Sequence, residues 1–153
     1  MTQWAATKRM AAEVALAEGQ TIRGDLHLQA SVARHDGPET PLEMLNRPDP
    51  FFPMTLPSGE VIFVSKAQVA VVACGTEVTP LDPARDSVAK HFGLDVMLRG
   101  GVEFRGSATG EMPPTRSRTL DYLNSSEPFF EIAIKGRTLL IHRAHVRVVR
   151  PTS

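Results

Sequence analysis

The feature of this chain that most constrains its fold is an internal repeat. Residues 14–24 align with residues 96–106, and five positions of this stretch are identical. Three more pairs of segments follow in the same order: 42–46 with 120–124, 50–52 with 128–130, and 64–72 with 141–149. The offset falls from 82 to 78 to 77, with the gaps in turn-like sequence. We interpret the pattern as duplication of one small unit. Chance similarity between unrelated strand segments is the alternative.

The repeat predicts two small domains within the 153 residues, in place of one ordinary domain. We assign residues 1–78 to the first repeat, 79–93 to a linker and helix, and 94–153 to the second repeat. The apolar fraction of 42% is enough for a packed core and argues against wholesale disorder. The 12 prolines and 11 glycines favour many turns over long helices.

Each repeat is expected to begin with a short helix and a hairpin. A helical pattern covers residues 83–92 before Gly93, a typical helix-stop residue, and a weaker one covers residues 2–10. Apolar residues then alternate on both sides of Gly19 in the first repeat and of Gly100 and Gly101 in the second. Alternation around a glycine turn is typical of a β-hairpin.

A second helical segment is expected after the hairpin of the first repeat. Thr40 can cap it, Pro41 suits its first position, and Glu43 completes a capping box. This helix should end near Asn46. Alternating or β-branched apolar residues then predict three short strands in each repeat, at 52–56, 61–64 and 69–72, and at 130–134, 138–141 and 146–149.

Five short strands in about 60 residues cannot bury the faces of an open sheet well. Closure into a small barrel removes the exposed edges, so we predict a mainly β protein made of two tandem five-stranded barrels. Each barrel would carry a short N-terminal helix and a short helical insertion. One continuous β-sandwich is the alternative.

The repeats resemble the Sm-like family of small barrels, which includes bacterial Hfq. The opening motif of that family is similar to residues 14–24 and 96–106, and its Asp and Leu-Asn motif is similar to residues 43–46 and 121–124. The last hairpin of the family resembles residues 140–149. The resemblance implies an SH3/Sm-like barrel fold and RNA binding. Lys66 and Arg143 stand at the lysine of the Hfq Lys-His pair, whereas Ala67 and Ala144 stand at its histidine.

The resemblance also supplies the candidate ligand-binding residues. Asn46 and Asn124 match the loop asparagine that binds a base in the family. The alternative is that each is a helix C-terminal or turn residue that tolerates positive φ. Lys66, His142 and Arg143 either touch phosphate or are solvated charges at strand ends. His145 and Arg147 complete the candidate set, which is Asn46, Asn124, Lys66, His142, Arg143, His145 and Arg147.

Charge is divided unequally between the repeats, although the net charge of the chain is zero. Residues 13–78 hold four Lys/Arg and nine Asp/Glu, which gives −5, and residues 94–153 hold nine and six, which gives +3. The basic end of the second repeat could meet RNA, or it could meet the acidic repeat of the same or a neighbouring chain. Arg23 and Arg105 are either surface residues or partners of Glu43 and Asp121.

No catalytic motif, cofactor site or metal site is predicted. The sequence has no phosphate loop or nucleophile elbow, and His142 and His145 are expected on different strand faces or on either side of a turn. The single cysteine, Cys74, excludes an internal disulfide and fits a reducing cytoplasm. No stretch long enough to span a membrane is seen.

These observations favour a non-catalytic binding or assembly module that contacts a protein partner or a second copy of itself. In the pairs Phe51-Phe52 and Phe129-Phe130, neighbouring side chains point to opposite faces of a strand, so one phenylalanine of each pair is expected to face outward. An Sm-like RNA-binding protein is the alternative function.

Overall fold

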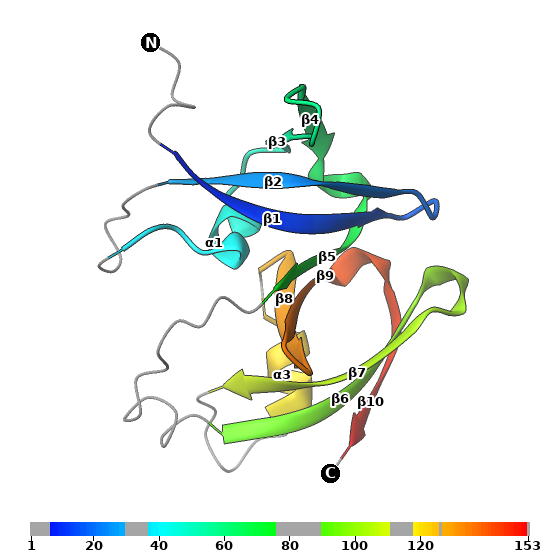
Figure 1. The fold of residues 1–153 in the computed structure, drawn as a ribbon. Coiled ribbons are helices and arrows are strands. Elements are labelled where there is room, and N and C mark those ends of the chain that lie inside the picture. The colour runs from blue at the N-terminus through cyan, green and yellow to red at the C-terminus, as the bar shows by residue number, and fades with distance from the viewer. Residues whose placement is uncertain (1–6, 30–36, 76–89, 111–117, 126, 153) are drawn as a thin grey trace. The chain divides into compact units, whose positions relative to one another are not determined.

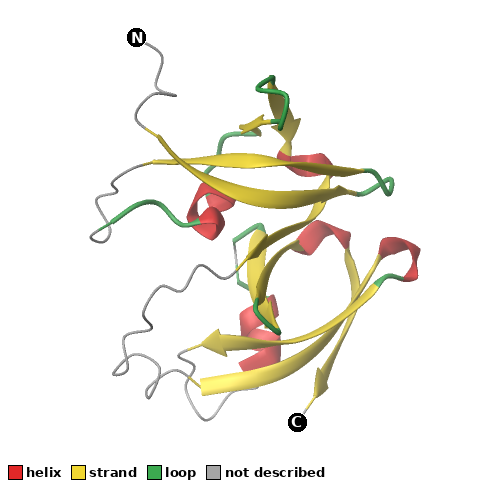
Figure 2. Ribbon diagram, viewed as in Figure 1, coloured by secondary structure: helices red, strands yellow, loops and turns green. Residues whose placement is uncertain are grey.

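The computed structural model describes residues 7–29, 37–75, 90–110, 118–125 and 127–152. The chain divides into two compact units, Met1–Cys74 (unit 1) and Gly75–Ser153 (unit 2). Within the described residues there are ten antiparallel strands and two short α-helices, so the predicted mainly β class is confirmed. Strands dominate both units in Figure 2.

Unit 1 is one antiparallel sheet with a short helix. Its elements are β1 (Thr7–Leu16), β2 (Thr21–Gln29), α1 (Pro41–Asn46), β3 (Phe51–Thr55), β4 (Val61–Ser65) and β5 (Val69–Gly75). The strand order in the sheet is β5-β1-β2-β3-β4. Figure 1 shows β1 and β2 running side by side, in register from Thr7 opposite Gln29 to Ala15 opposite Thr21. The predicted hairpin around Gly19 is therefore confirmed.

Unit 2 repeats this order of elements. It consists of β6 (Lys90–Leu98), β7 (Glu103–Gly110), α3 (Arg118–Leu123), β8 (Phe129–Ile134), β9 (Arg137–His142) and β10 (Val146–Thr152). The strand order is β10-β6-β7-β8-β9, which corresponds strand for strand to unit 1. A short 3-10 turn precedes the last strand in both units, at Lys66–Gln68 and at Arg143–His145.

The predicted closure into barrels is wrong for the strands described. In unit 1, β4 and β5 are the end strands and are not paired with each other, and the described strands β9 and β10 of unit 2 are likewise unpaired with each other. Each five-stranded sheet is thus open. Helix α1 lies where the capping-box sequence predicted it.

The helices predicted at the start of each repeat are wrong where the structure describes them. Residues 7–10 belong to β1, and residues 90–92 belong to β6, whereas residues 2–6 and 83–89 lie outside the described residues. In β1, residues 7–15 pair with β2, and residues 12–16 pair with β5. These two ladders, together with burial of Ala12 and Val14, favour the extended conformation over an isolated helix of a few turns.

One glycine in each unit allows two strands to approach closely. A Cβ added to Gly24 in β2 would lie 2.6 Å from the carbonyl oxygen of Thr55 in β3. In unit 2, a Cβ on Gly106 would lie 2.6 Å from the carbonyl oxygen of Ala133. Because such distances are far below van der Waals contact, both positions require glycine. Strands β2 and β3, and β7 and β8, begin to pair beside these glycines.

The arginines before these glycines pair across the hairpin. Arg23 lies opposite Glu13, with Nε 3.2 Å from the carboxylate, and Arg105 lies opposite Asp95 at 3.6 Å. The suggested pairing with the helix carboxylates Glu43 and Asp121 is therefore wrong. Both arginine side chains are largely exposed, so each pair contributes only about 0–1 kcal/mol.

Candidate functional site

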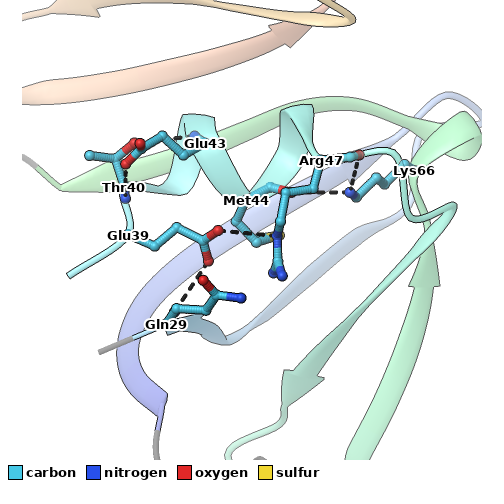
Figure 3. Close-up of polar contacts among 7 residues, drawn as sticks. All are labelled: Gln29, Glu39, Thr40, Glu43, Met44, Arg47 and Lys66. Carbon is cyan, nitrogen blue, oxygen red and sulfur yellow. Dashed lines mark hydrogen bonds and ion pairs between the residues drawn. The ribbon is translucent and has the colours of Figure 1, made fainter. Parts of the chain in front are cut away.

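Helix α1 begins with a complete capping box. The Thr40 main-chain N–H donates to Glu43 Oε1 at 2.9 Å, and the Glu43 N–H donates to Thr40 Oγ1 at 3.1 Å. Pro41 occupies the first turn, where its missing N–H costs nothing. Figure 3 shows this pair of contacts at one end of α1 and Lys66 at the other. A helix of six residues is thus defined at both ends by side chains.

Lys66 supplies the hydrogen-bond donor for main-chain carbonyls at the C-terminal end of α1. Its ammonium donates to the carbonyl oxygens of Met44 at 3.0 Å and of Arg47 at 2.9 Å. The last carbonyls of a helix lack partners within the helix and carry partial negative charge, so a cation is stabilised there. Lys66 is only 8% exposed, and burial, followed by the nearby Arg47, lowers the pKa of its ammonium.

A buried carboxylate holds the segment before α1 to β2. Glu39 Oε1 accepts a hydrogen bond from the main-chain N–H of Gln29 at 3.2 Å, and Oε2 lies 3.1 Å from Nε of Arg47. The Arg47 Nε–H does not point along that line, so this contact is an ion pair without a hydrogen bond. Figure 3 shows Glu39 between these two partners.

In unit 2, Arg143 takes the place of Lys66. Its Nε donates to the carbonyl of Leu123 at 2.9 Å and its Nη2 to that of Tyr122 at 2.8 Å, at the end of α3. Its Nη1 donates to the carbonyl of Glu127 and, at 3.4 Å, to that of Phe129. The guanidinium thus cross-links the helix end to the start of β8.

Two aromatic rings extend this contact. The Arg143 guanidinium carbon lies 5.1 Å from the centre of the Phe130 ring, and the Tyr122 ring meets Phe130 edge-on with centres 5.9 Å apart. The Tyr122 hydroxyl donates to the carbonyl of Glu131 at 2.7 Å and accepts from its N–H at 3.1 Å. Burial raises the pKa of the Tyr122 phenol, which keeps the donating proton in place.

The structure places the two histidines of the candidate set together. His142 stacks on Phe129 with ring centres 4.5 Å apart, and His145 approaches His142 edge-on at 5.0 Å. His145 is 8% exposed, so its ring is not a surface group. Among the described residues, no group of three His, Cys, Asp or Glu side chains could hold a metal ion.

The remaining candidates are Asn46, Asn124 and Arg147. Asn46 is the last residue of α1, and Asn124 follows α3, where its main-chain N–H donates to the Leu120 carbonyl at 3.0 Å. Both asparagines lie at or directly after a helix end, and in the described part of the chain no residue other than glycine has positive φ. Arg147 is exposed at an irregularity in β10.

Lys66 and Arg143 therefore have defined partners that are not a ligand. Both side chains point to main-chain carbonyls at a helix end, which neither the phosphate hypothesis nor the solvated-charge alternative included. The signal in the sequence was their common position in the alignment, 77 residues apart, directly after the fourth strand of each repeat.

An exposed apolar face lies on the β3–β4 hairpin. Phe51, Val61 and Phe63 are 56%, 44% and 65% exposed, and the strand register places Phe63 opposite Pro53 on the same face. We call Phe51, Pro53, Val61 and Phe63 the hairpin face. The prediction that one phenylalanine of each pair points outward is confirmed for Phe51 and Phe52.

In unit 2, the same prediction is wrong. Phe129 and Phe130 are 1% and 2% exposed, so both are buried. The positions of unit 2 that correspond to Phe51 and Phe63 are Phe129 and Leu140, and Leu140 is also 1% exposed. The two units thus share a fold but differ in how this face is covered.

Sequence patterns did not identify Val61 and Phe63 as surface residues. Residues 61–64 are all apolar, so period-2 alternation is absent and neither face of β4 can be assigned to solvent.

Comparisons with protein-family models, with curated proteins and with solved structures give no match. Among the described residues, no helix is both long and apolar enough to cross a membrane.

Proposed function

We propose that this chain is a non-catalytic interaction and assembly module. The hairpin face carries this proposal, because it gathers large apolar side chains in one place on the surface of unit 1. Soluble domains rarely expose contiguous apolar side chains of this size unless another molecule covers them. The single cysteine fits a reducing compartment, so the proposed setting is the cytoplasm.

The proposal includes an origin of the two units by duplication of one Sm-like fold. Four correspondences support it. Both units have the same strand order, both have a glycine at the close approach of the second and third strands, and both place a cation on the end of the helix. The ion pairs of Arg23 and Arg105 also coincide. Repetition of such specific contacts is harder to attribute to chance than repetition of apolar positions.

A comparison of two serine variants tests the assembly function. Phe51→Ser removes the apolar side chain from the hairpin face, whereas Val102→Ser is a matched control at an exposed apolar position of unit 2. Light scattering and pull-down with purified protein should show self-association or partner binding for the native chain and for Val102→Ser. Phe51→Ser should show neither self-association nor partner binding. A native chain that stays monomeric and retains no protein contradicts the proposal.

RNA binding is the second candidate function. It is favoured by Lys135, Arg137 and Arg147, which are exposed in unit 2, the repeat with the positive net charge. Filter binding with U-rich and A-rich RNA at two salt concentrations tests it, because phosphate contacts weaken as salt rises. Arg147→Ala should then weaken binding to both RNAs. Weak binding that Arg147→Ala leaves unchanged contradicts RNA as the ligand.

A further inference from the structure

The pair of residues that joins the start of the third strand to the end of the fourth differs between the two units. In unit 2, Phe129 lies opposite His142, and their rings stack with centres 4.5 Å apart and an angle of 18° between the planes. In unit 1, the corresponding pair is Phe51 opposite Ser65. Directly opposite residues point to the same face of a sheet, so the imidazole of His142 covers a ring face that Ser65 is too small to cover.

A second ring follows in unit 2 but not at the corresponding position of unit 1. His145, in the 3-10 turn after β9, approaches His142 edge-on with ring centres 5.0 Å apart. Its counterpart in the 3-10 turn after β4 is Gln68, which is exposed and carries no ring. The exposed fractions agree with this difference, because Phe129 is 1% exposed and Phe51 is 56% exposed. The ring of Phe51 is therefore accessible to a planar group of another molecule.

The charge of unit 1 favours a cation as that group. Residues 13–78 hold four Lys/Arg and nine Asp/Glu, which gives −5, and the carboxylate of Asp49 is exposed two residues before Phe51. The cations Arg47 and Lys66 are already engaged, the first with a buried carboxylate and the second with two main-chain carbonyls. An acidic surface attracts a cationic group and disfavours the phosphates of a nucleic acid.

A guanidinium combines the two required properties, because it is planar and always charged. The protein already contains a contact of this kind, since the guanidinium carbon of Arg143 lies 5.1 Å from the centre of the Phe130 ring. Lysine has the charge without the plane, and an ordinary histidine is mostly neutral at pH 7. Arginine is therefore the side chain that best fits an exposed aromatic ring on an acidic unit.

We infer that the ring of Phe51 binds an arginine side chain of a protein partner, in the position that His142 holds on Phe129. The guanidinium stacks on the ring, and the negative charge of unit 1 stabilises its positive charge. The partner is thus a protein that presents a basic, arginine-bearing segment. This inference rests on the proposed interaction function and names the chemistry of the partner that the hairpin face receives.

Fluorescence anisotropy with two labelled peptides tests the preference for arginine. The peptides have equal length and charge, with serine alternating with arginine in one and with lysine in the other. The native chain should bind the arginine peptide about threefold more tightly than the lysine peptide, because a cation stacked at an exposed site contributes on this scale. Phe51→Leu keeps an apolar side chain without the ring and should bind both peptides equally. Equal binding of the two peptides by the native chain overturns the inference.

Ser65→His tests where the guanidinium binds. The new imidazole should cover the Phe51 ring as His142 covers Phe129, and it should weaken binding of the arginine peptide by about threefold or more. Val102→His places the same ring at an exposed apolar position of unit 2 and should leave the affinity unchanged. Circular dichroism checks that both variants are folded. An unchanged affinity of folded Ser65→His for the arginine peptide contradicts the stacked position.

The outcomes separate this inference from the proposed function. If the native chain retains a protein through Phe51 but binds both peptides equally, the inference fails and the interaction function stands. A labelled U-rich RNA is the third probe, because a nucleobase is also planar. If Phe51→Leu loses the RNA and not the arginine peptide, the ring binds a base and the inference is wrong. A native chain that stays monomeric and retains no protein overturns both.

Discussion

The ammonium of Lys66 donates a hydrogen bond to the carbonyl of Met44, 22 residues earlier in the chain, at the C-terminal end of α1. In unit 2, the guanidinium of Arg143 bonds the carbonyl of Tyr122, the residue that aligns with Met44. In each unit a cation that follows the fourth strand therefore ties the short helix to the sheet. Because a helix of six residues is too short to be stable alone, this contact is expected to matter for folding.

Lys66→Met should lower the free energy of unfolding by about 2 kcal/mol, because a buried and a partly buried carbonyl lose their donor while the apolar stem is kept. Urea denaturation followed by circular dichroism measures the change. Lys66→Arg, which restores a cation of the kind present at Arg143, should lose less stability than Lys66→Met. Equal losses for the two variants would mean that the charge–carbonyl contact is not what stabilises unit 1.

Arg143→Ala should cost about 3 kcal/mol of unfolding free energy, since four carbonyls and the Phe130 ring lose one shared partner. Arg147→Ala is the control, because Arg147 is exposed and surface substitutions change stability by at most about 0.5 kcal/mol. Thermal and urea unfolding of both variants distinguish them. Similar midpoints for the two would contradict the role of Arg143.

Gly24→Ala and Gly106→Ala should each destabilise the protein by about 2 kcal/mol, because the added methyl group collides with a main-chain carbonyl of the next strand. Gly75→Ala is the matched control, since no atom lies within 4 Å of a Cβ at that position and its φ is not positive. Urea midpoints of the three variants decide the matter. A loss for Gly75→Ala as large as for the other two would exclude the steric explanation.

The stability of the folded chain is expected to decrease as the pH falls, because of His27. Its Nε2 lies 2.7 Å from Thr55 Oγ1 in a buried contact, and burial, followed by Arg9, lowers the pKa of His27 below 6.5. Between the lowered value and 6.5 the unfolded chain binds a proton that the folded chain does not bind. The contribution of His27 is therefore complete above pH 6.5 and is lost as the pH falls below it, by up to about 1.4 kcal/mol per pH unit.

Urea denaturation of the native chain and of His27→Gln between pH 7.5 and pH 5.5 checks this dependence. The glutamine keeps a hydrogen-bonding group near Thr55 but does not titrate. The slope of unfolding free energy against pH should be smaller in His27→Gln over this range. Equal slopes in the two proteins would show that His27 does not set the dependence.

The predictions that held relied on interactions between near neighbours in the chain. The capping box of Thr40 and Glu43 spans three residues, and the hairpin at Gly19 joins strands that follow each other directly. The helix predicted over residues 2–10 failed where it is described, because residues 7–10 pair with residues 26–29 of β2 and continue the strand that β5 holds at residues 12–16. A weak local helical preference cannot compete with strand pairing that extends the hairpin.

The candidate site was predicted less well than the fold. The sequence singled out Lys66 and Arg143 through the repeat, but their partners lie about 20 residues earlier and are main-chain atoms, which leave no pattern in a sequence. For the hairpin face, the sequence predicted that one residue of the pair Phe51-Phe52 is exposed, but it did not predict the exposure of Phe63. Four consecutive apolar residues do not show which side of β4 is covered.

The sequence alone determined the repeat, the strand-rich composition, the turns at glycine and the start of α1, since these depend on residues within a few positions of one another. Only the tertiary structure decided that each sheet stays open and that Lys66 and Arg143 bond to the carbonyls at the ends of the helices. It also decided that Phe51 is exposed while Phe129 is buried. Burial depends on what packs against a face from distant parts of the chain, so the same Pro-Phe-Phe sequence has two different environments in this protein.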